Sequence, residues 1–162
     1  MVAPRQTVRQ QLEAHAAYSY RRDPAVPAFP DDKPVIVFDG VCVLCTGFAR
    51  FVARRDRRLQ FRFTAAQSRL GTALFRHYGL DPVNYETNLL IADGRAFGKM
   101  DAFAGIMRRL GGIWRVGGLA DRVPVPFGEA CYDRIARNRY RLFGRRETCV
   151  VPDQTWRARL LD

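Results

Sequence analysis

The chain has 162 residues, of which 48% are hydrophobic and 12% aromatic, a composition that excludes a disordered protein and suits one folded domain. Its net charge of +11 comes almost entirely from arginine, but the charge is spread along the chain and does not favour dedicated nucleic-acid binding. The sequence contains no membrane-spanning apolar run, no secretory signal pattern and no disulfide framework among its four cysteines, so we expect a cytoplasmic location.

Residues 1–33 have the features of a loosely ordered N-terminal extension. A helix over residues 7–20 would have only a weak apolar face, and the prolines that follow Arg22 indicate an irregular linker. We therefore expect the folded domain, including its last helix, over residues 34–152 and a short basic tail over residues 153–162.

From Pro34 onward, short apolar runs alternate with helical patterns. The run over residues 35–38 is typical of a strand buried on both faces. The later predictions are a helix over 42–55, a strand over 59–63 with Leu59 inward, a helix over 68–78, a hairpin of 89–91 and 95–97, and helices over 101–110 and 128–143. This order predicts a thioredoxin-like α/β fold, a central mixed sheet flanked by helices, with an extra C-terminal helical segment.

The most informative feature is the CxxC sequence of Cys42 and Cys45, which opens a helix directly behind a buried strand. Two cysteines three residues apart in a first helical turn lie on one face, close enough to form a disulfide. The helix N-terminus offers unpaired N–H groups and a partial positive charge, which favour a thiolate. We expect Cys42, the more exposed cysteine, to attack a substrate disulfide and the more buried Cys45 to resolve the mixed disulfide.

Asp39 lies in the turn before Cys42 and has two interpretations that can coexist. Its carboxylate can accept a proton from a thiol, and aspartate is also a common turn residue and helix cap. A nearby carboxylate raises a cysteine pKa whereas a helix N-terminus lowers it. The direction of the pKa shift of Cys42 therefore stays open at this point.

A metal-binding module is a competing interpretation, in which the cysteine pair is joined by Cys149 or Cys131. A structural zinc site usually has four nitrogen or sulfur ligands, often as two close pairs, and here one pair is accompanied by two single cysteines. We expect both single cysteines to be small buried packing residues. No metal and no cofactor are predicted, because the redox pair would be the protein's own cysteines.

Outside the cysteines, few residues point to chemistry. His15 and His77 lack ligand spacing to a cysteine and are expected at the surface. Arg137, Arg139 and Tyr140 in the last helix either line a cleft that binds an anion or anchor that helix by hydrogen bonds. Both alternatives remain open from the sequence.

Residues 38–45 resemble the signature of the DCC family, thiol–disulfide oxidoreductases of thioredoxin-like type, whose Asp, Cys, Cys pattern is matched by Asp39, Cys42 and Cys45. Further matches follow in order at Arg55-Asp56, Gln67-Ser68, Asp101-Ala102, Leu110-Gly111-Gly112, residues 132–140, Phe143-Gly144 and Cys149. The resemblance covers about residues 34–152 and implies a thioredoxin-like fold.

The resemblance further implies disulfide exchange between the Cys42–Cys45 pair and a disulfide- or dithiol-containing substrate, most simply a protein. Thioredoxins carry a cis proline before the third core strand, whereas the corresponding residues 86–88 contain no proline. Substrate docking along that backbone therefore differs here. A basic adaptor on the same scaffold is the remaining alternative, and a membrane-associated partner is compatible with the sequence.

Overall fold

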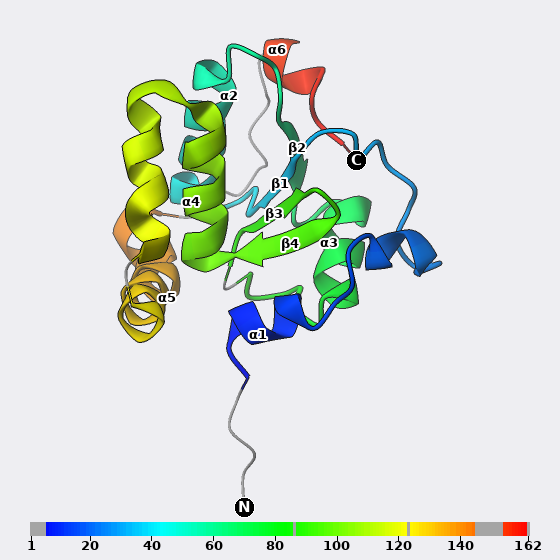
Figure 1. Cartoon of the computed structure of the whole chain (residues 1–162), viewed down its shortest axis with the longest axis horizontal. Coiled ribbons are helices and arrows are strands. Elements are labelled where there is room, and N and C mark those ends of the chain that lie inside the picture. The colour runs from blue at the N-terminus through cyan, green and yellow to red at the C-terminus, as the bar shows by residue number, and fades with distance from the viewer. Residues whose placement is uncertain (1–5, 86, 123, 145–153, 162) are drawn as a thin grey trace, which may run out of the picture.

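The computed structural model describes residues 6–85, 87–122, 124–144 and 154–161. Its centre is a four-stranded sheet with helices on both faces (Figure 1). The strands are β1 (Val35–Phe38), β2 (Arg62–Ala65), β3 (Leu89–Ala92) and β4 (Arg95–Gly98), arranged in the order β2-β1-β3-β4. The sheet is mixed, because β1 and β2 are parallel while β3 is antiparallel to both β1 and β4.

The helices complete the thioredoxin-like α/β architecture that the order of elements predicted. They are α1 (Val8–Glu13), η1 (Ser19–Arg22), α2 (Val43–Arg55), α3 (Arg69–His77), α4 (Lys99–Leu110), η2 (Gly112–Arg122), α5 (Val125–Phe143) and α6 (Gln154–Arg157), where η marks a 3₁₀ helix. Helix α5 is the expected extra C-terminal helix. Within the described ranges, no helix is both long and apolar enough to cross a membrane.

Strand β1 is buried on both faces, as its uninterrupted apolar sequence predicted. Val35 and Val37 face a core cluster formed with α1, η1 and α3, whereas Ile36 and Phe38 face a second cluster formed with α2, α4 and α6. The end of β1 is therefore fixed from both sides, which holds the turn that follows it.

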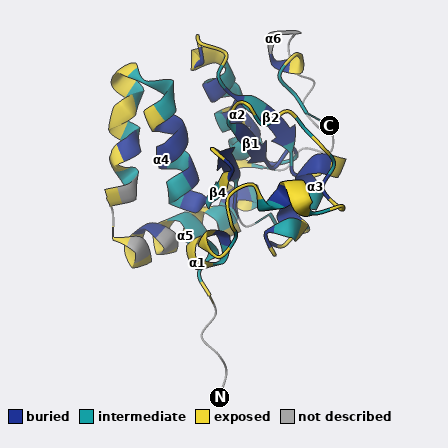
Figure 2. Cartoon of the chain, turned by 45° about the vertical axis from the view of Figure 1, so that its right-hand side comes forward, coloured by how far each residue is buried: buried dark blue, intermediate teal, exposed yellow. Residues whose placement is uncertain are grey.

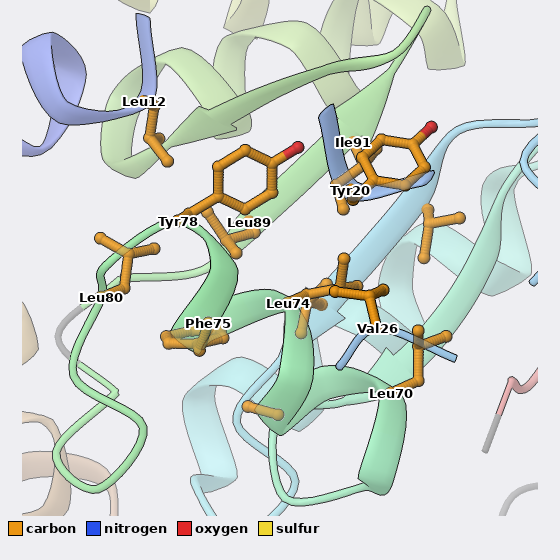
Figure 3. Close-up of a cluster of buried hydrophobic side chains, with 13 residues drawn as sticks. Leu12, Tyr20, Val26, Leu70, Leu74, Phe75, Tyr78, Leu80, Leu89 and Ile91 are labelled. Carbon is orange, nitrogen blue, oxygen red and sulfur yellow. The ribbon is translucent and has the colours of Figure 1, made fainter. Parts of the chain in front are cut away.

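The N-terminal segment closes the first core cluster instead of packing loosely (Figure 3). Leu12, Tyr20 and Val26 are at most 9% exposed and pack with Leu74 of α3. The expected loose order of residues 1–33 therefore does not hold for the described residues 6–33. The apolar side chains come singly from α1, from η1 and from a loop, so no helical periodicity reveals them.

Helix α1 is shorter than the helix predicted over residues 7–20. The Thr7 side chain caps it, with Gln10 completing a capping box, and the helix ends before Ala14. Tyr18 then adopts a left-handed backbone conformation with φ of 58°, which separates α1 from η1. Local backbone geometry thus bends this segment so that both pieces reach the core.

Strand β2 begins three residues later than predicted. The buried Asp56 carboxylate accepts hydrogen bonds from the N–H groups of Gln60 and Phe61 at 3.1 and 2.9 Å, which holds this segment in a turn. Leu59 has a φ of 50° there and is 53% exposed, so the prediction that it points inward is wrong. Phe61 and Phe63, in the same predicted strand, are fully buried.

Two helix starts also differ from the sequence predictions, although both helix ends match. Helix α4 begins at Lys99 behind Gly98, so Asp101, the predicted start, lies in its first turn. Helix α5 begins at Val125, three residues before Gly128. The sequence predicts these two helix ends better than the helix starts, because each helix is followed by a glycine with positive φ, which stops a helix.

The described part of the predicted basic tail packs on the edge of the sheet. The Phe63 N–H donates to the Arg159 carbonyl at 2.9 Å, and the Leu161 N–H donates to the Phe63 carbonyl at 2.8 Å. Trp156 is 2% exposed in the second core cluster, and Arg159 pairs with the buried Asp56 at 3.0 Å. The segment thus covers the open edge of β2.

Candidate functional site

The cysteine pair lies where the sequence predicted it, at the start of α2 directly after β1. Cys42 is the residue that caps α2, and its Sγ accepts a hydrogen bond from the Cys45 N–H at 3.3 Å. The Thr46 hydroxyl donates to the Cys42 carbonyl at 2.7 Å. The first turn of the helix is therefore closed around the Cys42 sulfur.

The exposure of the two cysteines is the reverse of what we expected. Cys42 is completely buried and Cys45 is half-buried, and both are free thiols in the structure. The physical reason is the capping role of Cys42, because its side chain turns back toward the N–H groups of the first turn instead of outward. A substrate disulfide can thus meet the Cys42 sulfur only after that sulfur becomes exposed.

The two thiols differ strongly in acidity. A hydrogen bond from the Cys45 thiol, together with the Cys45 backbone N–H, outweighs the effect of burial and lowers the pKa of Cys42 to about 7. The same hydrogen bond and burial raise the pKa of Cys45 well above its ordinary value. About half of the Cys42 thiol is therefore ionised near pH 7, while Cys45 keeps its proton.

Asp39 is buried beside the cysteines and holds the turn between β1 and α2. Its Oδ1 atom accepts hydrogen bonds from the Val41 N–H at 3.1 Å and from Gln67 Nε2 at 2.7 Å. Gln67 in turn accepts from the Gly40 N–H at 2.9 Å. Asp39 therefore has the turn-forming contacts of one sequence interpretation, and its negative charge raises the pKa of Cys42 against the stronger hydrogen bonds.

The second oxygen of Asp39 is held by α5. Arg139 Nη2 lies 3.3 Å from Oδ2, and the Tyr140 hydroxyl donates a hydrogen bond to the same oxygen. Arg139 is itself buried and also donates to the Asn84 carbonyl at 2.6 Å. Of the two alternatives for these residues, the contacts favour anchoring: the anion that Arg139 contacts is the carboxylate of Asp39.

Helix α5 also contacts the backbone at Asn88, next to the position at which thioredoxins carry a cis proline and this chain has none. The Tyr132 hydroxyl donates to Asn88 Oδ1 at 2.8 Å and accepts from the Asn88 N–H at 3.2 Å. Burial raises the pKa of Tyr132 to about 12, so it stays a neutral donor. Within the described ranges there is no cis peptide bond, and the Asn88 N–H is occupied by a side chain of the same chain.

The ligand atoms of Asp39, Cys42 and Cys45 lie within 4.8 Å of one another, which is close enough for a shared cation. The Asp39 oxygens, however, already accept four hydrogen bonds, one of them from the Arg139 cation. Zinc usually takes a fourth ligand as well. Among the described residues, Cys131 does not belong to this group of close ligand atoms, and its exposed thiol contradicts its predicted packing role. Cys149 lies outside the described residues. The arrangement suits a thiol pair better than a metal.

Gln67 and Tyr132 also form contacts at this site, a role that no sequence pattern predicts for them. Gln67 lies 28 residues after its partner Asp39, and Tyr132 lies 44 residues after its partner Asn88. No local sequence pattern links residues so far apart. His77 is mostly buried, against its predicted surface position, because its Nδ1 pairs with Asp23 at 2.7 Å and its Nε2 contacts Ser19 at 2.8 Å.

Comparison with known proteins identifies relatives over the part of the chain that contains this site. The model of the DCC1-like thiol-disulfide oxidoreductase family matches residues 36–145. Over 127 residues the chain is 36% identical to the uncharacterized protein YuxK of Bacillus subtilis (strain 168), covering 78% of this chain and 93% of that protein. Over 122 residues it is 32% identical to the DCC family protein At1g52590, chloroplastic, of Arabidopsis thaliana, covering 75% and 71% respectively. No solved structure matches the chain.

Proposed function

Because the chain belongs to the DCC1-like thiol-disulfide oxidoreductase family, we propose that it exchanges a Cys42–Cys45 dithiol or disulfide with a substrate disulfide or dithiol. The observation that carries this proposal is the geometry of the pair: Cys42 caps α2, and its Sγ accepts a hydrogen bond from the Cys45 N–H at 3.3 Å. A thiolate at Cys42 beside a protonated Cys45 is the state from which exchange starts.

In the reducing direction, the Cys42 thiolate attacks one sulfur of the substrate disulfide. A bond forms between Cys42 and that sulfur, and the substrate disulfide breaks with release of the first substrate thiolate. Because Cys42 is buried in the dithiol state, we propose that its sulfur becomes exposed as the substrate docks. The pKa of Cys42, and not its exposure, makes it the nucleophile.

Cys45 completes the reaction after losing its proton, for which we propose Asp39 as the acceptor. The Cys45 sulfur then attacks Cys42, the mixed disulfide breaks, and the second substrate thiolate leaves. Two electrons pass from the protein to the substrate, and the two substrate thiolates take up protons. The reverse sequence oxidises a dithiol, and the reduction potential decides the direction.

We propose that the substrate is a protein with a disulfide or dithiol, that no cofactor beyond the cysteine pair takes part, and that the protein works in the cytoplasm. Cys42 is buried whereas Cys45 is half-buried, which supports a docking step that exposes the Cys42 sulfur before exchange. The contacts of Asp39 support a reaction that uses only side chains of this chain.

The test is a redox titration of the full chain in defined thiol buffers, with alkylation resolved by mass for each cysteine. We expect one reversible two-electron transition that joins Cys42 to Cys45, abolished in both Cys42→Ser and Cys45→Ser. Cys131→Ser is the matched control, because this exposed thiol lies outside the pair and its loss should leave the transition unchanged. If no Cys42–Cys45 disulfide formed at any redox potential of the thiol buffers, the result would contradict the proposal.

A further inference from the structure

Helices η2 and α5 carry a group of exposed apolar side chains that the proposed redox function does not use. The exposed residues of the two helices are coloured yellow in Figure 2. On η2, Ile113 is 76% exposed and Val116 is 70% exposed, and on α5, Phe127 is 72% exposed and Leu142 is 65% exposed. Single exposed apolar residues are ordinary, but a group of them on neighbouring elements marks an interaction surface. We call these side chains, with Leu119 and Ile135, the η2/α5 surface.

This surface faces away from the sheet. Helix α4 lies between η2 and the sheet, and η2 contacts both α4 and α5 (Figure 1). The inner side of α5 carries Tyr132, Arg139 and Tyr140, which contact Asn88 and Asp39. The apolar side chains on the outer side of α5 therefore are not part of the core.

The outer side of α5 has two adjacent stripes at helical spacing. Phe127, Cys131, Ile135 and Leu142 form the apolar stripe, because residues about four apart lie on one side of a helix, and all four are exposed. The exposed arginines 134, 137 and 141 form the neighbouring stripe. This division into apolar and basic stripes is the pattern of a helix that lies in a lipid interface.

The exposed charges described on these two helices are basic, and the half-buried Asp133 of α5 is paired with Lys99 at 2.7 Å. Among the described side chains of η2 and α5, the exposed charged ones are all arginines, at positions 115, 122, 134, 137 and 141. A second copy of the chain would bring these like charges together, which disfavours self-association. A nucleic acid would satisfy the arginines but leave the phenylalanine, leucine and isoleucine side chains without a partner. An anionic bilayer offers phosphates to the arginines and an apolar layer to the other side chains.

We propose that the η2/α5 surface binds the surface of an anionic lipid bilayer. The apolar stripe of α5 enters the boundary between headgroups and acyl chains, and the arginines contact lipid phosphates. No described helix could cross the membrane, so the protein lies on the bilayer through this face. The proposal stands independently of the proposed redox function, although α5 connects the two sites.

The test is co-sedimentation of the full chain with lipid vesicles. Vesicles of phosphatidylcholine with about one third phosphatidylglycerol are compared with vesicles of phosphatidylcholine alone. We expect binding to the anionic vesicles only, and we expect it to weaken as salt rises because the arginine–phosphate attraction is screened. Absence of binding to anionic vesicles at low salt overturns the proposal.

Two variants test the two stripes separately. Arg134→Gln/Arg137→Gln/Arg141→Gln should lower the partition coefficient about a hundredfold, since each basic residue near an anionic surface contributes about fivefold. Ile135→Asn/Leu142→Asn should lower it at least about tenfold through loss of apolar burial. Unchanged binding of the second variant contradicts insertion of the apolar stripe and so overturns the proposal.

Matched controls change the same kinds of residue elsewhere. Leu59→Asn/Val83→Asn removes exposed apolar side chains, and Arg54→Gln/Arg57→Gln/Arg58→Gln removes three exposed charges. Both controls should bind within about threefold of the wild type. If the charge control loses as much binding as the arginine variant of α5, the overall net charge causes the binding. If the wild type is a dimer and Ile135→Asn/Leu142→Asn is a monomer, the face serves self-association. Either result overturns the proposal.

The Cys42–Cys45 redox titration is repeated on each variant. We expect an unchanged transition in all of them, because every substituted side chain lies outside the site. A lost transition together with lost lipid binding in Ile135→Asn/Leu142→Asn indicates a misplaced α5 and contradicts a surface-only role. Failure of lipid binding and failure of the redox proposal are thereby distinguishable.

Discussion

Asp39 and Arg139 act on the Cys42 thiol in opposite directions. The carboxylate raises the pKa of Cys42 and the guanidinium lowers it, while hydrogen bonds from Cys45 make the largest contribution. The sequence left the sign of this shift open, because the Asp39 carboxylate and the helix N-terminus act on a thiol in opposite directions. It also gave no sign that Arg139, 100 residues from Asp39 along the chain, lies at this site. The structure decides the sign through the hydrogen bonds from the Cys45 thiol and N–H, which together outweigh burial and the Asp39 charge.

The substitution Asp39→Asn should move the pH dependence of Cys42 alkylation to lower pH while the protein stays folded. Loss of the negative charge removes an influence that raises the Cys42 pKa, while the hydrogen bonds from Cys45 and the charge of Arg139, which lower it, remain. Exchange should slow about a hundredfold if the carboxylate accepts the proton of Cys45. Both are measured as pH–rate profiles, with Glu13→Gln as a control at an exposed carboxylate. An unchanged profile would remove Asp39 from the chemistry.

Tyr140 is a positioning residue in the proposed reaction, and Tyr132 provides its matched control. Tyr140→Phe removes a hydrogen bond to the buried Asp39 carboxylate, so we expect a loss of about 1.5–3 kcal/mol in the free energy of unfolding and a slower exchange with an altered pH profile. Tyr132→Phe removes the hydroxyl that contacts Asn88 and should cost stability without changing the profile. If both variants gave the same profile as the wild type, the role of Tyr140 would be purely structural.

At the scale of elements, sequence patterns identified the four described strands and helices α2, α3, α4 and α5, but they missed η2 and failed where an element depends on distant contacts. Strand β1 and helix α2 follow from a continuous apolar run and a change of period. The turn at Leu59 depends instead on the buried Asp56, which is held by Arg159 from the far end of the chain. Helix α1 has few apolar residues, and only its position over the sheet shows that they are buried.

The substitution Leu12→Ala measures how firmly this N-terminal segment is attached. Leu12 is 4% exposed in the first core cluster, so its truncation should lower the free energy of unfolding by about 2–4 kcal/mol. Val83→Ala, at a position that is 75% exposed, should change it by no more than about 0.5 kcal/mol. Chemical denaturation gives both values, and a neutral Leu12→Ala would mean that the segment contributes nothing to the core.

At the scale of the whole molecule, the acidity of Cys42 links redox state, pH and stability. Folding lowers the pKa of this thiol from its usual 9.0 to about 7, so the folded dithiol form holds fewer protons than the unfolded chain between these values. The contribution is fully present above about pH 9 and is lost as the pH falls through about 7. The reduced protein should therefore become more stable as the pH rises over this range.

Urea denaturation of the reduced protein at several pH values between about 6 and 9 tests this link, with an expected gain of up to about 2 kcal/mol. Cys42→Ser should remove most of the slope, whereas Cys131→Ser, at an exposed thiol, should keep it. The same slope in Cys42→Ser and in the wild type would show that other groups cause the pH dependence.

The sequence by itself determined the parts of this protein that depend on neighbours in the chain. A buried strand, a turn at Asp39 and two cysteines in the first turn of a helix follow from local periodicity and spacing. Only the tertiary structure decided that Gln67, Arg139 and Tyr140 meet at Asp39 and that Cys42 is the buried cysteine. The reason is physical: periodicity records which side of an element is apolar, but the partners of a buried charge depend on how distant elements pack.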